Sequence, residues 1–246
     1  MQEAYDALGR ASEQPIQVQV QHGIARFVTA DIPTEGSNPT ERARHYLDTF
    51  GALYGLHASS GVELILRRTT KISEEEATVV FAQRYQNLPV FGGELLVSLQ
   101  QDRVYSTIGS LLKPDRFFSN TPTLSSKDAI ARAQAAVRAP GAKTFADPIL
   151  EIFDAAVSDG GMTSSSNARL AWRVFLETPA RREVHLDAHD GSLLSTFATE
   201  QEDYDLDLQT ANGNEATIAN LCYYLTSDDD AIGDEDGLER GYHGDR

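Results

Sequence analysis

Residues 78–108, TVVFAQRYQNLPVFGGELLVSLQQDRVYSTI, contain two runs of alternating apolar residues on either side of the hexapeptide Leu88-Pro89-Val90-Phe91-Gly92-Gly93. Successive side chains of a β-strand point to opposite faces, so every second residue shares a face. The sets that share a face are Val79, Phe81, Gln83 and Tyr85 in the first run and Leu95, Val97 and Leu99 in the second. This pattern predicts a half-buried antiparallel hairpin.

The hexapeptide between the two runs has the residues of a redirected connection. Pro89 lacks an amide hydrogen, and Gly92 and Gly93 can adopt positive φ angles. These properties favour a bulge or a sharp change of direction over a central strand. Taken alone, a turn of this kind is a common loop without a specific function.

The same stretch resembles the pro-region of secreted thermolysin-type and fungalysin-type zinc peptidases, in the part known as the FTP domain. The resemblance rests on the strand that ends in Tyr85, on LPVFGG at residues 88–93, and on a return strand with Val104-Tyr105-Ser106. It implies that this chain controls a protease and is not itself the catalyst. The motif residues Leu88, Pro89, Val90, Phe91, Gly92 and Gly93 would then have a structural role.

Length and charge restrict the class of protein further. A chain of 246 residues can form one or two domains, and no apolar run reaches the roughly 18 residues of a membrane span. The net charge of −16 disfavours nucleic acid and anionic membranes as partners. A single cysteine, Cys222, excludes an internal disulfide. The first fourteen residues are too polar for a signal peptide, so we expect any export signal to have been removed or to lie outside this chain.

The first half of the chain predicts a hairpin, then a helix, then four strands. Residues 16–28 alternate around Gln21-His22-Gly23, which is typical of a hairpin. Asn38 is a good N-cap, with Pro39 and Glu41 following, and an apolar stripe then continues to Gly55. Strands are expected near residues 62–68, 77–85, 94–100 and 103–109.

The second half repeats the order of helix and four strands. Ser125 can cap a helix that Pro140-Gly141 ends, and strands are expected near residues 148–154, 168–178, 182–188 and 192–199. A Gly- and Ser-rich loop is expected at 158–167. This half resembles the PepSY-type domain of the same pro-regions, through the helix near 128–139, LAWRV at 170–174 and the hairpin VHLDAHDG at 184–191.

We therefore expect an α+β fold of two similar subdomains, each a curved antiparallel sheet packed on one helix as in cystatin-like folds. The expected divisions are an N-terminal hairpin region at 1–36, an FTP-like subdomain at 37–115 and a PepSY-like subdomain at 116–199. An acidic extension at 200–246 would lead toward a catalytic domain that this chain does not contain. Residues 199–246 hold fourteen Asp and Glu against two Arg, a net charge of −12.

The chain has no group with the pattern of a catalytic or metal centre. The zinc peptidases use a His-Glu-x-x-His helix, and the six histidines include no such pair. His185, Asp187 and His189 share a strand face, but the outer two lie about 13 Å apart, too far to bind one ion. We interpret them as a solvated face, and Trp172 as part of the core. Asp228–Gly233 and the Asp203, Asp205 and Asp207 series lack the complete pattern of a calcium loop.

The resemblance implies two roles for the chain, intramolecular inhibitor and folding chaperone of a secreted zinc metallopeptidase. Zinc and calcium would then belong only to the absent catalytic domain, which would be the partner in cis. The inhibitory segment is expected within Phe197–Asp207, with Phe197, Tyr204 and Leu206 as its apolar residues. One alternative is a stand-alone secreted module that inhibits a separate peptidase in trans. A third is the N-terminal fragment of an active peptidase.

Overall fold

The computed structural model describes residues 1–57, 60–113, 119–158, 167–179 and 181–198, and the backbone of two short strands beyond them. Residues 1–178 and 183–197 form one compact unit, which contains both predicted subdomains. In the second unit, residues 179–182 and 198–246, strand β11 (Asp207–Gln209) pairs antiparallel with β12 (Glu215–Thr217). No helix of the described residues is long and apolar enough to cross a membrane.

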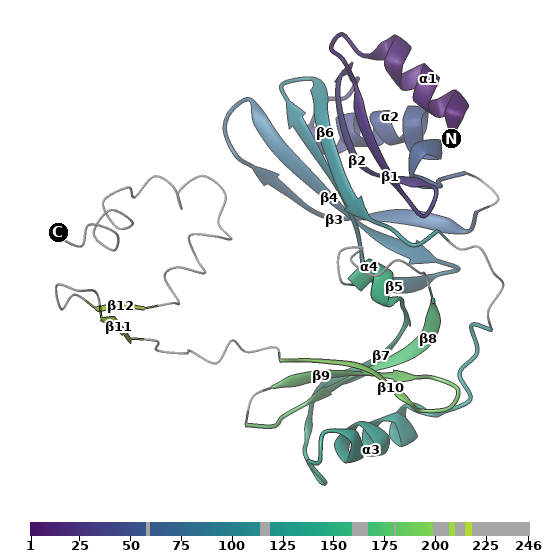
Figure 1. Ribbon diagram of the computed structural model, residues 1–246, viewed down its shortest axis with the longest axis vertical. Helices are drawn as coiled ribbons and strands as arrows, with labels where there is room; N and C mark the ends of the chain where they lie inside the picture. Colours follow the sequence, from purple (N-terminus) through teal and green to yellow (C-terminus); the bar gives the residue numbers. More distant parts are fainter. Residues whose placement is uncertain are drawn as a thin grey trace. The chain divides into compact units, whose positions relative to one another are not determined.

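The first sheet of the compact unit has six antiparallel strands in the order β1-β2-β6-β5-β4-β3 (Figure 1). The hairpin, the helix and the four strands predicted for this half are all present. Helix α1 was not predicted, because its first turns are polar. The elements in chain order are α1 (Gln2–Ala11), β1 (Gln17–Gln21), β2 (Ile24–Pro33), α2 (Pro39–Phe50), the 3₁₀ helix η1 (Gly51–Tyr54), β3 (Val62–Lys71), β4 (Glu76–Tyr85), β5 (Leu88–Gln100) and β6 (Arg103–Ser110).

Helix α2 begins where its capping residues predict. The Asn38 side chain accepts a hydrogen bond of 3.0 Å from the Glu41 amide, and the Glu41 carboxylate accepts one of 2.8 Å from the Ser37 amide. The first bond satisfies an amide group that the first helical turn leaves without a partner, and the second ties Ser37, the residue before the cap, to that turn. The helix continues into η1 and ends at Gly55, whose φ of 75° is left-handed.

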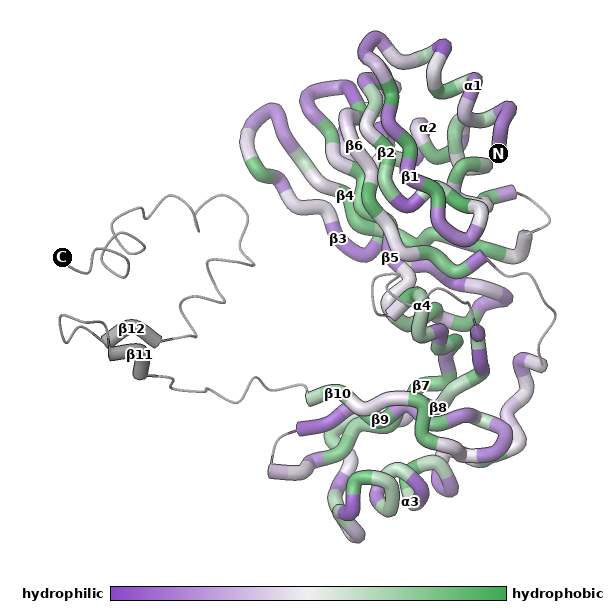
Figure 2. Tube along the Cα trace, viewed as in Figure 1, coloured by the Kyte–Doolittle hydropathy of each residue, from purple (hydrophilic) through white to green (hydrophobic). Residues whose placement is uncertain are grey.

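The core of the first sheet lies between its strands and the helices α1 and α2. The predicted apolar face of β5 is buried, since Leu95, Val97 and Leu99 are at most 1% exposed, and α2 contributes Tyr46 and Phe50 to the same cluster. Figure 2 shows the apolar stretches within the strands and the hydrophilic tips of the hairpins. The hydrophobic effect therefore fixes which face of this sheet receives the helices.

The second sheet has the strand order β7-β8-β9-β10, with α3 packed on one face (Figure 1). The face toward α3 is apolar and includes Val174, Leu176, Val184 and Leu186. Trp172 is half-buried beside this cluster and donates to the Leu124 carbonyl at 2.9 Å. The elements are α3 (Ser126–Ala136), β7 (Thr144–Phe153), α4 (Ala155–Ser158), β8 (Arg169–Leu176), β9 (Arg182–Asp187) and β10 (Leu193–Ala198). The fold is thus α+β, with mainly antiparallel sheets and few helices, as predicted.

The LPVFGG hexapeptide is part of β5, which begins at Leu88 and not at Glu94 as predicted. The turn before it is Gln86-Asn87, whose φ angles of 49° and 65° suit a tight hairpin. Arg84 pairs with Pro89 and Ala82 with Glu94, so residues 90–93 all lie opposite Gln83. The hexapeptide therefore combines a strand start with a large bulge.

The two glycines of the motif fit this bulge for different reasons. Gly92 has a φ of 70°, and a Cβ there would lie 3.1 Å from the Ser158 Cα. A Cβ on Gly93 would lie 3.0 Å from Gln83 Cβ and from Val90 Cβ. Glycine at 92 therefore permits the backbone conformation, and glycine at 93 permits the close approach of the two strands.

We predict that Gly93→Ala destabilises the chain by about 1–3 kcal/mol, because the added methyl overpacks a buried site. Urea unfolding followed by circular dichroism measures this change. Gly9→Ala in α1 is the matched control, since its Cβ would meet only Ile16 Cδ1 at an ordinary 3.5 Å. The control should gain up to about 1 kcal/mol of helix propensity. Equal changes for the two variants would contradict the close-approach argument.

Candidate functional site

The bulge at residues 90–93 joins the two sheets. Val90 is 6% exposed and pairs in parallel with Ile152 of β7. The Gln83 side chain, itself 1% exposed, donates to the Leu112 carbonyl at 2.6 Å and accepts from the Leu112 amide at 2.7 Å. A single glutamine thus holds Leu112, two residues after β6, against the bulge.

Phe91 extends from the bulge to the face of the second sheet opposite α3. Its ring centroid lies 4.3 Å from that of His185, 5.9 Å from that of Phe153 and 5.5 Å from that of Phe197. His185 lies at the centre of the group, 5.0 Å from Phe153 and 5.5 Å from Phe197. We call these four residues, Phe91, Phe153, His185 and Phe197, the His185 ring cluster.

The solvated strand face predicted for His185 and Asp187 is wrong. The two residues do share a face of β9, but they are 0% and 6% exposed, and His189 lies in the turn after the strand. The rings of the cluster cover His185, and these rings come from β5, β7 and β10. The sequence-based interpretation failed because the alternation in β9 does not tell which of its two faces another module covers.

A carboxylate lies beside His185 in the same buried layer. Glu151 of β7 is 0% exposed, and its Oε1 lies 2.9 Å from His185 Nε2. Its Oε2 lies 3.2 Å from an Arg173 guanidinium nitrogen, and the guanidinium also reaches Glu183 at 3.3 Å. The side-chain nitrogen and oxygen atoms of Glu151 and His185 make no well-aligned hydrogen bond to any described residue, so charge attraction to Arg173 is the main interaction of the Glu151 carboxylate.

Arg173 connects this charge cluster to the propeptide-like motif. Its guanidinium carbon lies 5.3 Å from the centroid of Phe91 and 5.3 Å from that of Phe175. A partly desolvated guanidinium attracts the face of an aromatic ring. Arg173 therefore orients Phe91 as well as neutralising Glu151.

The turn between β9 and β10 is held by Asp187. Its carboxylate accepts hydrogen bonds from the His189 amide at 2.8 Å and from Arg169 at 3.0 Å. The amide of Ser192 donates to Asp190, and this bond is the main reason that the pKa of Asp190 lies below its ordinary value. The Asp-Ala-His-Asp-Gly sequence thus forms the hairpin turn that determines where β10 begins.

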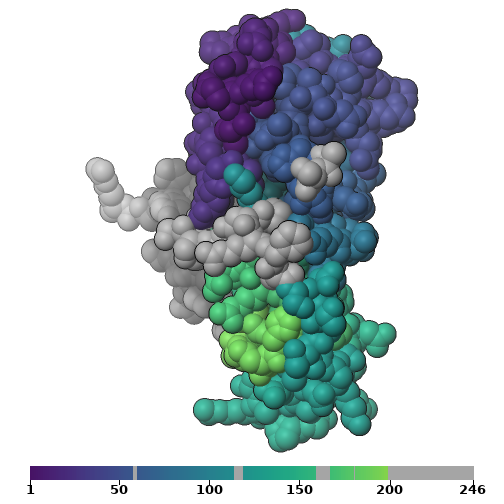
Figure 3. Space-filling model, turned by 90° about the vertical axis from the view of Figure 1, so that its right-hand side faces the viewer, coloured from purple at the N-terminus to yellow at the C-terminus, as the bar shows by residue number. Residues whose placement is uncertain are grey.

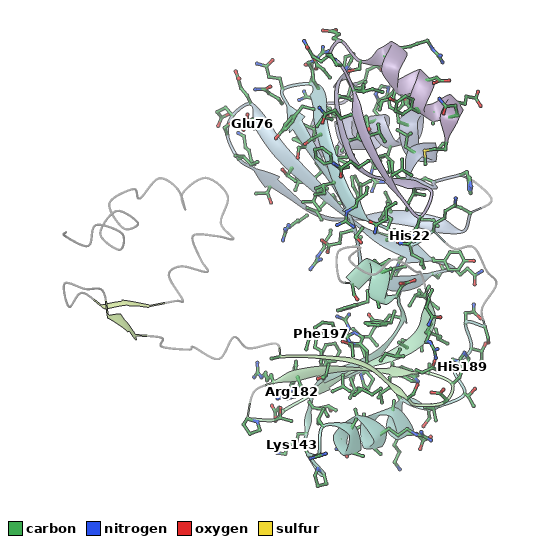
Figure 4. All side chains as sticks on the ribbon, viewed as in Figure 1. His22, Glu76, Lys143, Arg182, His189 and Phe197 are labelled. Atoms are coloured by element: carbon green, nitrogen blue, oxygen red, sulfur yellow. The ribbon has the colours of Figure 1, made fainter. Side chains whose placement is uncertain are left out.

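Phe197 is the second last residue of β10, and the segment expected to be inhibitory follows it. Figure 4 places Phe197 on the side of β10 away from α3, and Figure 3 shows the last part of the described chain at the surface. The side chain is 38% exposed in spite of its ring contacts. Tyr204 and Leu206, the other residues expected in the segment, lie outside the described residues.

The candidate site combines packed aromatic rings with a buried carboxylate. Among the described residues, no three His, Cys, Asp or Glu side chains come together as ligands for a metal ion. The residues missed from the sequence were Glu151, Phe153 and Arg173. The available signal was a lone acid in the apolar run Ile149–Phe153, because a charge inside a buried strand needs a charged partner.

We predict that Glu151→Ala destabilises the chain by about 3 kcal/mol, because Arg173 then loses its buried partner. Glu183→Ala is the matched control. It removes the other carboxylate that contacts Arg173, and the Glu183 side chain is 21% exposed. That variant should cost no more than about 1 kcal/mol. Urea unfolding at neutral pH compares the two, and equal losses would contradict a special role for the buried acid.

Comparison with known proteins gives two matches to protein families. Residues 62–111 match the fungalysin/thermolysin propeptide motif (FTP), and residues 123–197 match the peptidase propeptide and YPEB domain (PepSY). Among solved structures, the chain is similar to the Bacillus megaterium YpeB C-terminal domain, with 10% identity, 76% of each chain covered and a TM-score of 0.38. Curated protein sequences gave no match. The chain therefore carries a fungalysin/thermolysin propeptide motif followed by a PepSY domain, as its LPVFGG stretch and its second helix-and-strand half led us to expect.

Proposed function

We propose that this chain is the non-catalytic pro-region of a secreted thermolysin-like zinc metallopeptidase, which it inhibits and helps to fold. The observation that carries the proposal is the joint between the two propeptide modules. The FTP motif supplies Val90 and Phe91 to the second sheet, and the last strand of that sheet leads into the segment after Phe197. Both modules thereby contact the strand from which the chain leaves the second sheet.

Inhibition would act through the segment at residues 197–207. Acidic and apolar residues alternate in the sequence from Asp203 to Asp207, so an extended conformation would put Asp203 and Asp205 on one side and Tyr204 and Leu206 on the other. An extended peptide of this pattern can add as a strand to an exposed edge, with its main chain giving affinity and alternate side chains giving specificity. We propose that it occupies the substrate cleft of the peptidase in this way.

The chaperone role would follow from preferential binding to the folded enzyme. A partner that binds the native state and not the unfolded chain stabilises the native state by mass action. The compact unit offers a rigid surface, since its two sheets share a pairing at Val90 and Ile152. Release after maturation would leave a peptidase that is stable on its own or trapped kinetically.

The partner would be the peptidase catalytic domain, in cis when both belong to one polypeptide. Zinc would be bound by that domain, because residues 1–246 contain no His-Glu-x-x-His motif, and the resemblance to these peptidases places calcium there as well. Association would take place outside the cell. Coding DNA that continues in frame from Arg246 into His-Glu-x-x-His would establish inhibition in cis, and a stop codon would favour action in trans.

We predict that the full chain inhibits the cognate peptidase, measured as hydrolysis of a chromogenic peptide at increasing chain concentration. Tyr204→Ala with Leu206→Ala should weaken inhibition about tenfold or more, because two buried apolar contacts are lost. Tyr223→Ala with Leu225→Ala is the matched control beyond the segment and should leave the inhibition constant unchanged. No inhibition by the unmodified chain at micromolar concentration would overturn the proposed function.

A further inference from the structure

Strand β10 is held at its exit end mainly by one side chain. Most of the strand is exposed, with Leu193 48% and Phe197 38% accessible. Phe197 nevertheless contacts two rings, Phe91 at 5.5 Å and His185 at 5.5 Å, the second edge to face. The end of the second sheet is therefore fixed where Phe197 enters the His185 ring cluster.

One of the two rings that Phe197 contacts comes from the FTP motif. Phe91 is the member of the cluster that belongs to the first module, and Arg173 holds its ring by a cation–π contact at 5.3 Å. Beneath it, His185 and Glu151 are both 0% exposed, and a displacement of Glu151 would separate its carboxylate from Arg173. Phe91 thus presents a rigid surface to an exposed strand end.

We propose that Phe91 is a positioning residue for inhibition and acts through Phe197, which anchors the start of the inhibitory segment. This inference rests on the proposed function and adds to it a task for the LPVFGG motif. An anchor next to the segment lowers the conformational freedom that the segment must lose when it binds the peptidase. Loss of the Phe91 ring would weaken inhibition although Phe91 itself lies outside the inhibitory segment.

The size of the effect follows from the chemistry of the contact. The loss of an aromatic pair, with the apolar area that it buries, changes an equilibrium constant by about tenfold. If Phe91 and Phe197 act as one unit, removing either ring removes the whole effect. The double variant should then be no weaker than the single variants, because contacting residues are not additive.

The test is a double-mutant cycle in the full chain with Phe91→Ala, Phe197→Ala and both together. Inhibition of the peptidase is measured well below the unfolding midpoint of each variant. Each single variant should inhibit about tenfold less well, and the double variant should match them. Phe91→Leu keeps an apolar contact and should recover most of the inhibition, which separates positioning from a failure to fold.

Phe145→Ala is the matched control. Phe145 of β7 packs edge to face on Phe175 at 5.5 Å and lies outside the His185 ring cluster. It should lower stability while leaving the inhibition constant unchanged. Additive losses of about a hundredfold in the double variant, or an equal loss in Phe145→Ala, would overturn the inference.

Hydrogen exchange on the chain alone gives a readout that does not depend on the peptidase. The amides of β10 should exchange about tenfold faster in Phe91→Ala than in the unmodified chain, and no faster in Phe145→Ala. If the unmodified chain does not inhibit, the proposed function falls, while faster exchange in Phe91→Ala still supports the anchor. Unchanged exchange would refute the anchor even for a chain that inhibits.

Discussion

The close approach of Gly93 to Gln83 is the constraint on which the joint between the two sheets depends. Four residues must be accommodated opposite one, and glycine at 92 and 93 allows this without a strained φ angle or a tight Cβ contact. The bulge turns Val90 and Phe91 out of the first sheet. The same Gln83 side chain holds Leu112, so the connection after β6 is fixed by the residue that faces the bulge. Without the glycines, the bulge that joins the two modules would lose its defined geometry.

The second sheet uses buried charge where the first uses apolar packing. The ion pair of Glu151 and Arg173 lies beside His185, and well-packed hydrophobic residues of the same volume could replace such a pair with equal or higher stability. Charged groups in such a place favour one arrangement over others, because each displaced charge would remain unpaired in a medium of low polarity. The charge layer thus gives the ring of Phe91 a defined place, and the stability of the sheet comes from the apolar face toward α3.

The sequence predicted the elements better than their contacts. Alternation in β4 and β5 and the capping residues of α2 depend on neighbours in the sequence, so the hairpin and the helix could be derived from local rules. The burial of His185 could not, because it depends on Phe91, which precedes it by more than ninety residues. Helix α1 was missed for a related reason. Its apolar contribution is largely one buried residue, Leu8, which becomes informative only beside the core that it enters.

The motif and the exit of the chain are therefore connected through space and not through sequence. Phe91 belongs to a module that ends near Leu111, and Phe197 lies at the far end of the next module. Their contact through His185 makes the geometry of the exit depend on both modules at once. In a pro-region, such a dependence would couple the loss of the inhibitory segment to the loss of the joint, so that inhibition ends when the two modules come apart.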